Sequence, residues 1–290
     1  MITLFATPKN FTGIYKIIQK NALKSWRSLS PNIQIIIFGD SDGSKEISDE
    51  INAEYVPNVR CSPQGTPYLS DLFKKADQLA KFPIMTFINA DIILPEIFIE
   101  KVRILTNYKK NFLMVGHRWD MDVNYLIDFN NYKEQNSFWE EARKNSIKHG
   151  CTGIDYFIFR RFQWRNIPDF AIGRPGYDNW LLWNARRHLI HVIDATEDIM
   201  VVHQNHDYKF HNITKDPKLF NEPDGIMNRE IYKKKILNLL DTNYKLVNDK
   251  ILKKKSKEYR FRNLSKLPII FPELSILLYF YKKIYNRLYK

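Results

Sequence analysis

The chain has 290 residues, of which 44% are apolar and 27% charged, a composition that fits an ordinary folded protein and excludes the collagenous and disordered classes. Its two cysteines are too few for a disulfide framework, and no run reaches the ~20 apolar residues of a spanning helix. We therefore expect a protein of a reducing compartment without a membrane-spanning segment. The formal net charge is +13.

The positive charge is concentrated near the C-terminus. Residues 1–228 carry 28 Lys and Arg against 27 Asp and Glu, whereas residues 229–290 carry 17 against 5. Because the main part of the chain is nearly neutral, the charge distribution argues against a nucleic-acid groove there. We expect a catalytic domain over residues 1–228 and a basic extension over residues 229–290.

The N-terminal part alternates apolar runs with segments of helical spacing. Strands are predicted at 2–6, 33–38 and 84–88, and helices over 15–29 and 70–79. This alternation predicts an α/β fold with an open, mixed, mostly parallel sheet flanked by helices. In such sheets ligands bind at the carboxyl ends of the strands.

The later part of the main domain continues the alternation. Strands are predicted at 113–116, 156–159 and 199–202, and helices over 137–148 and from Asp178 onward. His203 follows the last of these strands and Asp178 opens the last helix. Both therefore lie where a polar side chain can reach a ligand.

The triplet Asn89-Ala90-Asp91 lies between two apolar runs. A carboxylate there is exposed at a strand end while its flanks stay buried, which suits Mg²⁺ or Mn²⁺ bound together with a diphosphate. By spacing alone, a turn or helix N-cap that contains Asn and Asp explains the triplet equally well.

Several motifs in a specific order resemble the GT-A class of nucleotide-sugar glycosyltransferases over roughly residues 1–212. These are Phe5-Ala6-Thr7-Pro8, Phe38-Gly39-Asp40, Gly65-Thr66-Pro67 through Asp71, Asn89-Ala90-Asp91, Gly153 to Phe157, Gly173 to Trp180, and Val202 to Tyr208. One departure is Asn89, which stands where the class usually has its first Asp. A neutral amide binds a cation less tightly, so Asp91 would contribute most of the binding.

The resemblance implies a Rossmann-like GT-A fold and transfer of a sugar from a UDP-, GDP- or CMP-linked donor to a glycan or lipid-linked acceptor in cell-surface polysaccharide biosynthesis. Charge accumulates on the departing diphosphate, which a Mn²⁺ or Mg²⁺ ion would stabilise. Asp91 and His203 are the implied metal ligands. His206 could share the site, contact the diphosphate or only pack.

An inverting enzyme also needs a general base for the acceptor hydroxyl. The resemblance places this role on Asp178, after the glycine-containing segment 173–176. The alternative is that Asp178 only caps the helix that it opens. A retaining enzyme of the same fold stays open as well.

The remaining candidates are expected to bind the nucleotide sugar. Asp155 would bind sugar hydroxyls and Arg118 a phosphate. The full set is Thr7, Asp40, Asp71, Asn89, Arg118, Asp155 and His206. No Gly-x-x-x-x-Gly-Lys or Gly-x-Gly-x-x-Gly motif is present, which argues against P-loop and nicotinamide enzymes.

The extension from residue 229 interleaves Lys and Arg with apolar and aromatic residues, with helical spacing over 229–262. Such a segment suits the surface of an anionic membrane, which would place the protein in the cytoplasm at the inner membrane face. The alternatives are packing on the catalytic domain or on a partner. A phosphoesterase or nuclease using Asp91, and a non-enzymatic nucleic-acid binder using the tail, are rival functions; we expect no nucleic-acid partner.

Overall fold

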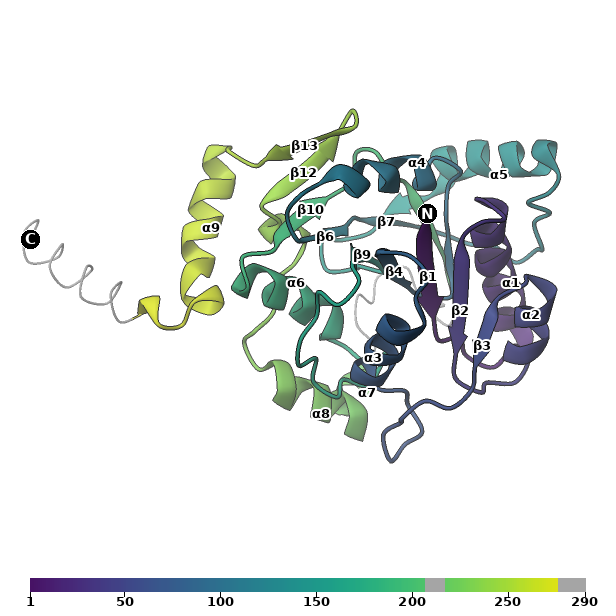
Figure 1. The fold of residues 1–290 in the computed structure, drawn as a ribbon, viewed down its shortest axis with the longest axis horizontal. Helices are drawn as coiled ribbons and strands as arrows, with labels where there is room; N and C mark the ends of the chain where they lie inside the picture. Colours follow the sequence, from purple (N-terminus) through teal and green to yellow (C-terminus); the bar gives the residue numbers. More distant parts are fainter. Residues whose placement is uncertain (207–216, 276–290) are drawn as a thin grey trace, which may run out of the picture.

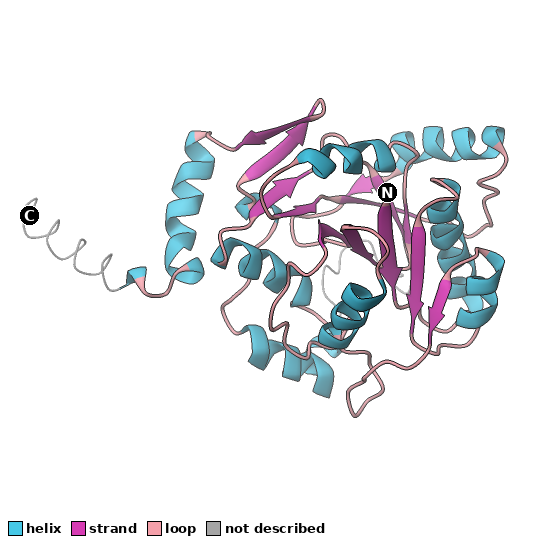
Figure 2. Cartoon of the chain, in the orientation of Figure 1, coloured by secondary structure: helices cyan, strands magenta, loops and turns pink. Residues whose placement is uncertain are grey.

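The computed structural model describes residues 1–206 and 217–275, and shows strands enclosed between helices (Figures 1 and 2). Among these residues, the central sheet has the strand order β13 (Lys250–Lys253), β12 (Tyr244–Val247), β10 (His191–Asp194), β6 (Phe112–Val115), β9 (Tyr156–Arg160), β4 (Ile84–Ile88), β1 (Ile2–Ala6), β2 (Gln34–Phe38) and β3 (Glu54–Val56). Strand β9 runs antiparallel to both of its neighbours and β13 is antiparallel to β12, whereas the other pairs are parallel. The predicted open, mixed, mostly parallel α/β sheet is confirmed.

A smaller sheet lies beside the central one. It consists of β5 (Ile92–Ile93), β11 (Val201–Gln204), β7 (Arg118–Met121) and β8 (Ile147–Lys148), in that order. Strands β11 and β7 are parallel, with His203 paired to Asp120. The predicted strand at 199–202 is therefore shifted toward the C-terminus, and His203 lies inside it.

Helices cover both faces of the central sheet where its strands are buried on both sides, as β1 and β2 are. Leu4 and Ile35 pack with α1 (Gly13–Ser28), α2 (Ser44–Glu50) and α4 (Phe98–Arg103). Phe5 and Ile36 pack on the opposite face with α3 (Leu69–Leu79) and α6 (Tyr177–Arg187). Residues that alternate along one strand thus contribute to two separate cores.

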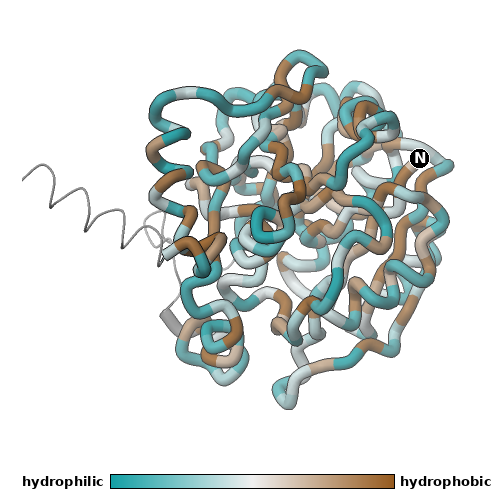
Figure 3. The backbone as a smooth tube through the Cα atoms, turned by 60° about the vertical axis from the view of Figure 1, so that its left-hand side comes forward, coloured by the Kyte–Doolittle hydropathy of each residue, from teal (hydrophilic) through white to brown (hydrophobic). Residues whose placement is uncertain are grey.

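The remaining helices are more peripheral, and some of them add single residues such as Leu105, Leu239 and Ile270 to these cores. They are α5 (Tyr132–Asn145), α7 (Pro217–Asn221), α8 (Pro223–Tyr232), α9 (Lys257–Ile270) and the 3₁₀ turns η1 (Ile104–Asn107) and η2 (Leu239–Asp241). Figure 3 shows hydrophilic and hydrophobic residues interspersed along the backbone of the fold.

The basic extension joins the main fold. Strand β12 pairs with β10, so residues 244–253 extend the central sheet as a hairpin, and the helix expected throughout 229–262 is wrong for this stretch. Helix α9 stands at the molecular edge beside this hairpin (Figure 1). The proposed boundary at residue 228 falls within α8. In the part of the chain that the structure describes, no helix has both the length and the apolar character required to span a bilayer.

Candidate functional site

A cavity of about 910 Å³ opens at the carboxyl ends of β1, β2 and β4, within the size range of small-molecule sites. Thr7 and Asp40 line it just after β1 and β2, and Asn89 and Asp91 line it just after β4. Gly39 has φ of +90°, and a Cβ there would lie 3.2 Å from Thr7 Oγ1, so glycine allows this close approach of two strand ends.

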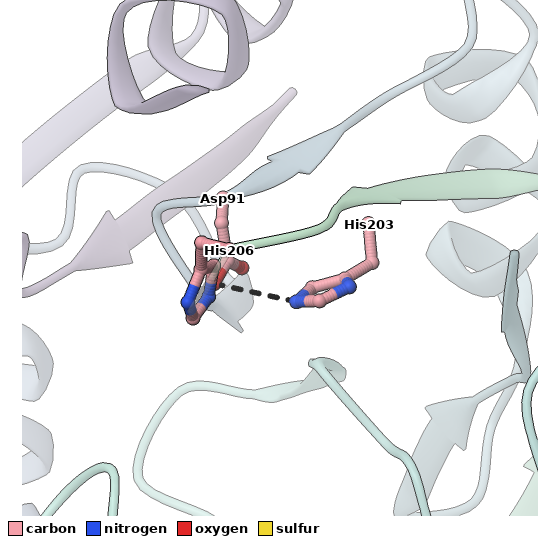
Figure 4. Close-up of side chains that lie close together, drawn as sticks. All are labelled: Asp91, His203 and His206. Carbon is pink, nitrogen blue, oxygen red and sulfur yellow. Dashed lines mark hydrogen bonds and ion pairs between the residues drawn. The ribbon is translucent and has the colours of Figure 1, made fainter. Parts of the chain in front are cut away.

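Three potential metal ligands meet in this cavity: Asp91, His203 and His206 (Figure 4). One ligand atom from each lies within 4.8 Å of the others. The Oδ2 atom of Asp91 is 3.1 Å from His206 Nε2 and 3.7 Å from His203 Nε2. The strand end after β4 supplies the carboxylate, and β11 with the residues after it supplies both imidazoles.

The Asp91 carboxylate fits a cation site on two grounds. Its Oδ1 atom is buried and has no hydrogen-bond partner among the described residues. A buried carboxylate oxygen without a partner is costly, and a bound divalent cation would satisfy it. Burial disfavours ionisation, but the interactions with His203, His206 and Arg118 outweigh it and hold the pKa of Asp91 well below its usual range. The ligand is therefore anionic near neutral pH.

Arg118 is surrounded by carboxylates. Its Nη1 lies 2.9 Å from Asp155 Oδ2 and its Nε lies 2.9 Å from Asp120 Oδ1. Burial opposes the charge of Arg118, but Asp155, Asp120 and Asp91 raise the pKa of this guanidinium. Three carboxylates around one guanidinium leave the site negative, which favours a cation. Arg118 is already paired within the protein, which weakens its predicted role as a phosphate ligand.

The amide of Asn89 is fixed by two neighbours. Its Nδ2 donates to Asp155 Oδ1 at 2.6 Å, and its Oδ1 accepts from the hydroxyl of Tyr177 at 3.4 Å. Asn89 therefore links β4, β9 and the start of α6 at the cavity wall. Asp155, which is 6% exposed, uses both oxygens within the protein, one toward Asn89 and one toward Arg118.

Asp178 lies in the first turn of α6 and is not among the residues that line the cavity. Backbone N–H groups of Asn179 and of Asp178 itself hydrogen-bond its carboxylate. Burial, together with the negative charge of Asp155, raises the pKa of Asp178 to about 7 despite those bonds. Helix α6 has Gly176 as its N-cap and no side-chain cap hydrogen bond, so the structure does not show the predicted capping role of Asp178, and the base role stays a prediction.

Asp71 also lies outside the cavity lining. It accepts the backbone N–H of Arg60 at 2.8 Å and the ammonium group of Lys75 at 2.6 Å. Those bonds give Asp71 a structural role, and its nucleotide-binding role stays a prediction. The other candidates for donor and metal binding all line the cavity, namely Thr7, Asp40, Asn89, Asp91, Arg118, Asp155, His203 and His206.

Sequence reasoning missed four residues near the site: Lys9, Tyr15, Asp120 and His149. The Tyr15 ring packs on His206 with centroids 5.1 Å apart, and Lys9 Nζ lies 3.1 Å from the Tyr15 hydroxyl. Asp120 contacts His203 through the pairing of β7 with β11. No local pattern identifies such residues, because the contacts depend on segments distant in the chain.

No protein-family model and no curated protein matches this chain. Solved structures with similarity include glucosyl-3-phosphoglycerate synthase from Mycobacterium tuberculosis in complex with Mg²⁺ and UDP, at 14% identity, 71% of this chain, 72% of the other and a TM-score of 0.44. A complex of that synthase with Mn²⁺, UDP and glucosyl-3-phosphoglycerate has 15% identity, the same coverage and the same TM-score. S. aureus TarS is similar over 42% of this chain and 22% of its own, at 10% identity and a TM-score of 0.34. Likeness at this level does not identify the ligand or the reaction of this chain.

Proposed function

We propose that the protein is a metal-assisted glycosyltransferase that moves a sugar from a nucleotide-sugar donor to a hydroxyl of a glycan or lipid-linked acceptor. The observation that carries the proposal is Asp91, an ionised carboxylate with one buried, unpartnered oxygen beside two imidazoles in a cavity at the strand ends. The resemblance of the motifs around it to the GT-A class supports the reaction type.

The protein side chains divide the work of donor binding. Asp91, His203 and His206 would hold a Mn²⁺ or Mg²⁺ ion, which would stabilise the charge on the departing diphosphate. Thr7 and Asp40 line the same cavity and bind the base or ribose. Asn89 and Asp155 are fixed to each other and present their remaining acceptor capacity to sugar hydroxyls.

The acceptor hydroxyl loses its proton to Asp178 in an inverting reaction. A pKa of about 7 suits this task, because the carboxylate is substantially ionised at neutral pH and still basic enough to take a proton. The acceptor must approach the start of α6, which the bond from Tyr177 to Asn89 ties to the cavity wall. Retaining transfer is the alternative, in which Asp178 only caps the helix.

A thermal-shift screen with UDP-, GDP- and CMP-sugars, each with and without Mn²⁺, tests the proposal. One nucleotide class should raise the unfolding temperature, and Mn²⁺ should strengthen that effect. Asp91→Ala should abolish the metal-dependent increase and the transfer, whereas Asp49→Ala, an exposed acid on α2, should not. If no nucleotide sugar raises the unfolding temperature, the proposal is contradicted.

We also propose that the basic extension places the enzyme on an anionic membrane surface during cell-surface polysaccharide biosynthesis. Phe261 and Leu264 of α9 are 76% and 59% exposed, and they lie beside the exposed basic residues Lys257 and Arg260. Exposed apolar side chains among basic ones suit the interface of an anionic bilayer. Residues 229–290 hold 17 Lys and Arg against 5 Asp and Glu, and this excess of positive charge supports the same partner.

A further inference from the structure

Asp120 is a carboxylate of the second sheet that the proposed reaction does not use. Strands β7 and β11 are parallel, and their register pairs Asp120 with His203. Paired residues of neighbouring strands project to the same face of a sheet, so the two side chains meet. Asp120 Oδ1 lies 3.0 Å from His203 Nδ1.

The His203 ring bridges two carboxylates. Its Nδ1 faces Asp120, and its Nε2 lies 3.7 Å from Asp91 Oδ2. His203 is only 4% exposed, so the ring is held in this orientation by its surroundings. A neutral imidazole has a single N–H, and the nitrogen that does not carry it offers a lone pair. An N–H on Nδ1 that donates to Asp120 leaves the lone pair of Nε2 facing Asp91.

Asp120 is itself fixed as an acceptor. Its Oδ2 lies 2.5 Å from His149 Nδ1, and its Oδ1 lies 2.9 Å from Arg118 Nε. A carboxylate at this place favours a proton on the nitrogen that faces it.

We propose that Asp120 is a positioning residue, which holds His203 in the tautomer whose Nε2 lone pair faces Asp91 and so prepares the cation site. The identity of that site rests on the proposed function. Carboxylates that orient a metal-binding histidine in this way contribute about 10- to 100-fold to metal affinity in other proteins. Asp120 is not one of the three grouped ligands, so its effect is exerted through His203.

The tautomer of His203 can be read directly in the wild-type protein without metal. The full chain is labelled with ¹⁵N-histidine at pH 8, and His203→Gln assigns its signals among the seven histidines. The proposal predicts a proton on Nδ1, and a shift toward the Nε2–H form in Asp120→Ala. A wild-type ring with its proton mainly on Nε2 would overturn it, whatever happens to the stability of the variant.

Calorimetric titration with Mn²⁺ alone then measures the consequence. Asp120→Ala should bind about 10- to 100-fold more weakly than the wild type. Asp122→Ala is the matched control, because Asp122 is two residues away, exposed, and bonded to Asn205. Its affinity should stay within about twofold of the wild type.

The outcomes separate the two proposals. If Asp91→Ala abolishes Mn²⁺ binding and Asp120→Ala binds like the wild type, the positioning role is wrong while the metal site stands. If the wild type binds no Mn²⁺ with or without UDP, the proposed metal-assisted function is overturned. The NMR measurement still decides in that case whether Asp120 sets the tautomer of His203.

Discussion

Single side chains near the cavity owe their charge states to partners that are distant in the sequence. Asp91 is ionised because its interactions with His203, His206 and Arg118 outweigh its burial, whereas burial and the negative charge of Asp155 raise the pKa of Asp178. The surroundings therefore shift the pKa values of these two buried aspartates in opposite directions. This contrast suits one acid that binds a cation and another that accepts a proton.

Asp178→Asn should remove transfer and, at the same time, stabilise the protein at alkaline pH. The folded-state pKa of about 7 lies above the ordinary value of about 4, so ionisation is disfavoured in the folded state. Wild-type stability should fall as pH rises from about 4 to about 7. The amide avoids this cost, so the free energy of unfolding at pH 8 should increase by about 1–3 kcal/mol, with no gain near pH 4.

Chemical denaturation at pH 4 and pH 8, together with a transfer assay, measures both effects. Asp49→Asn is the control, because Asp49 is exposed in an ion pair with Lys45 on α2. Transfer retained by Asp178→Asn would reject the base assignment and favour retention. If Asp178→Asn changes the free energy of unfolding equally at pH 4 and pH 8, the raised pKa of Asp178 is contradicted.

Lys9→Ala should weaken nucleotide-diphosphate binding. Of the basic residues that line the cavity, Arg118 is paired with Asp155 and Asp120 and Arg174 is paired with Glu222, whereas Lys9 contacts the hydroxyl and ring of Tyr15. Among the residues that the structure describes, the ammonium group of Lys9 has no carboxylate partner, so it can bind a phosphate without breaking an ion pair there. We expect about a 10-fold loss of UDP affinity at low salt and a smaller loss at high salt.

Calorimetry with UDP and Mn²⁺ at two ionic strengths tests the role of Lys9. Lys16→Ala removes an exposed lysine of α1 and should leave the affinity unchanged. Equal effects of the two variants would show that only the general charge matters.

At the scale of elements, a buried polar network attaches the Asp91 turn to α1 and β11. The amide of Gln204 donates from Nε2 to the carbonyl of Ile18 at 2.7 Å and to the carbonyl of Asp91 at 3.1 Å. Asn21 of α1 in turn donates to Gln204 Oε1 at 3.0 Å and accepts the backbone N–H of Ile127. The backbone position of Asp91 therefore depends on an amide from another sheet.

Gln204→Met should lower both stability and Mn²⁺ affinity. The methionine has a similar volume, but it removes the side-chain hydrogen bonds of Gln204 to the carbonyls of Ile18 and Asp91 and to the amide of Asn21, at a cost of about 1–3 kcal/mol. Urea denaturation and Mn²⁺ titration measure the two effects. Gln78→Met, on the exposed side of α3, should change neither. Full stability in Gln204→Met would show that the network contributes little.

Comparison of the predicted and observed elements shows where local sequence patterns are sufficient to predict secondary structure. The strands β1, β2 and β4 and the helices α1 and α3 were predictable, because periodicity and turn residues act over a few positions. The hairpin of β12 and β13 was not, since its charged residues read as a helix and its partner β10 lies some fifty positions earlier. Pairing with a sheet overrode the local preference.

At the scale of the whole molecule, the charge asymmetry distinguishes one end of the protein from the other. Helix α9 and its exposed Phe261 and Leu264 lie at the edge that also carries the basic hairpin (Figure 1). The cavity is formed instead at the strand ends of the central sheet. Membrane contact through α9 would therefore use a surface separate from the residues that line the cavity.

The full chain should bind vesicles that contain anionic phosphatidylglycerol and should not bind neutral phosphatidylcholine vesicles. Combined Phe261→Ser and Leu264→Ser should reduce binding about 10-fold, and added salt should weaken it. Leu189→Ser is the control, because Leu189 is a 77% exposed leucine at another place in the fold. Co-sedimentation measures binding. Tight, strongly salt-dependent binding to DNA in place of vesicles would favour the rival nucleic-acid function.

The amino-acid sequence by itself determined the alternating elements, the polar residues at the strand ends and the basic extension, since each depends on neighbours within a few positions. The sequence placed Thr7, Asp40, Asn89 and Asp91 at the strand ends of one sheet, and in the structure they line one cavity. Only the tertiary structure decided that Asp120 meets His203, that Arg118 is neutralised, and that Asp178 lies outside the cavity lining. These features arise from strand pairing and burial between distant segments, which no local pattern encodes.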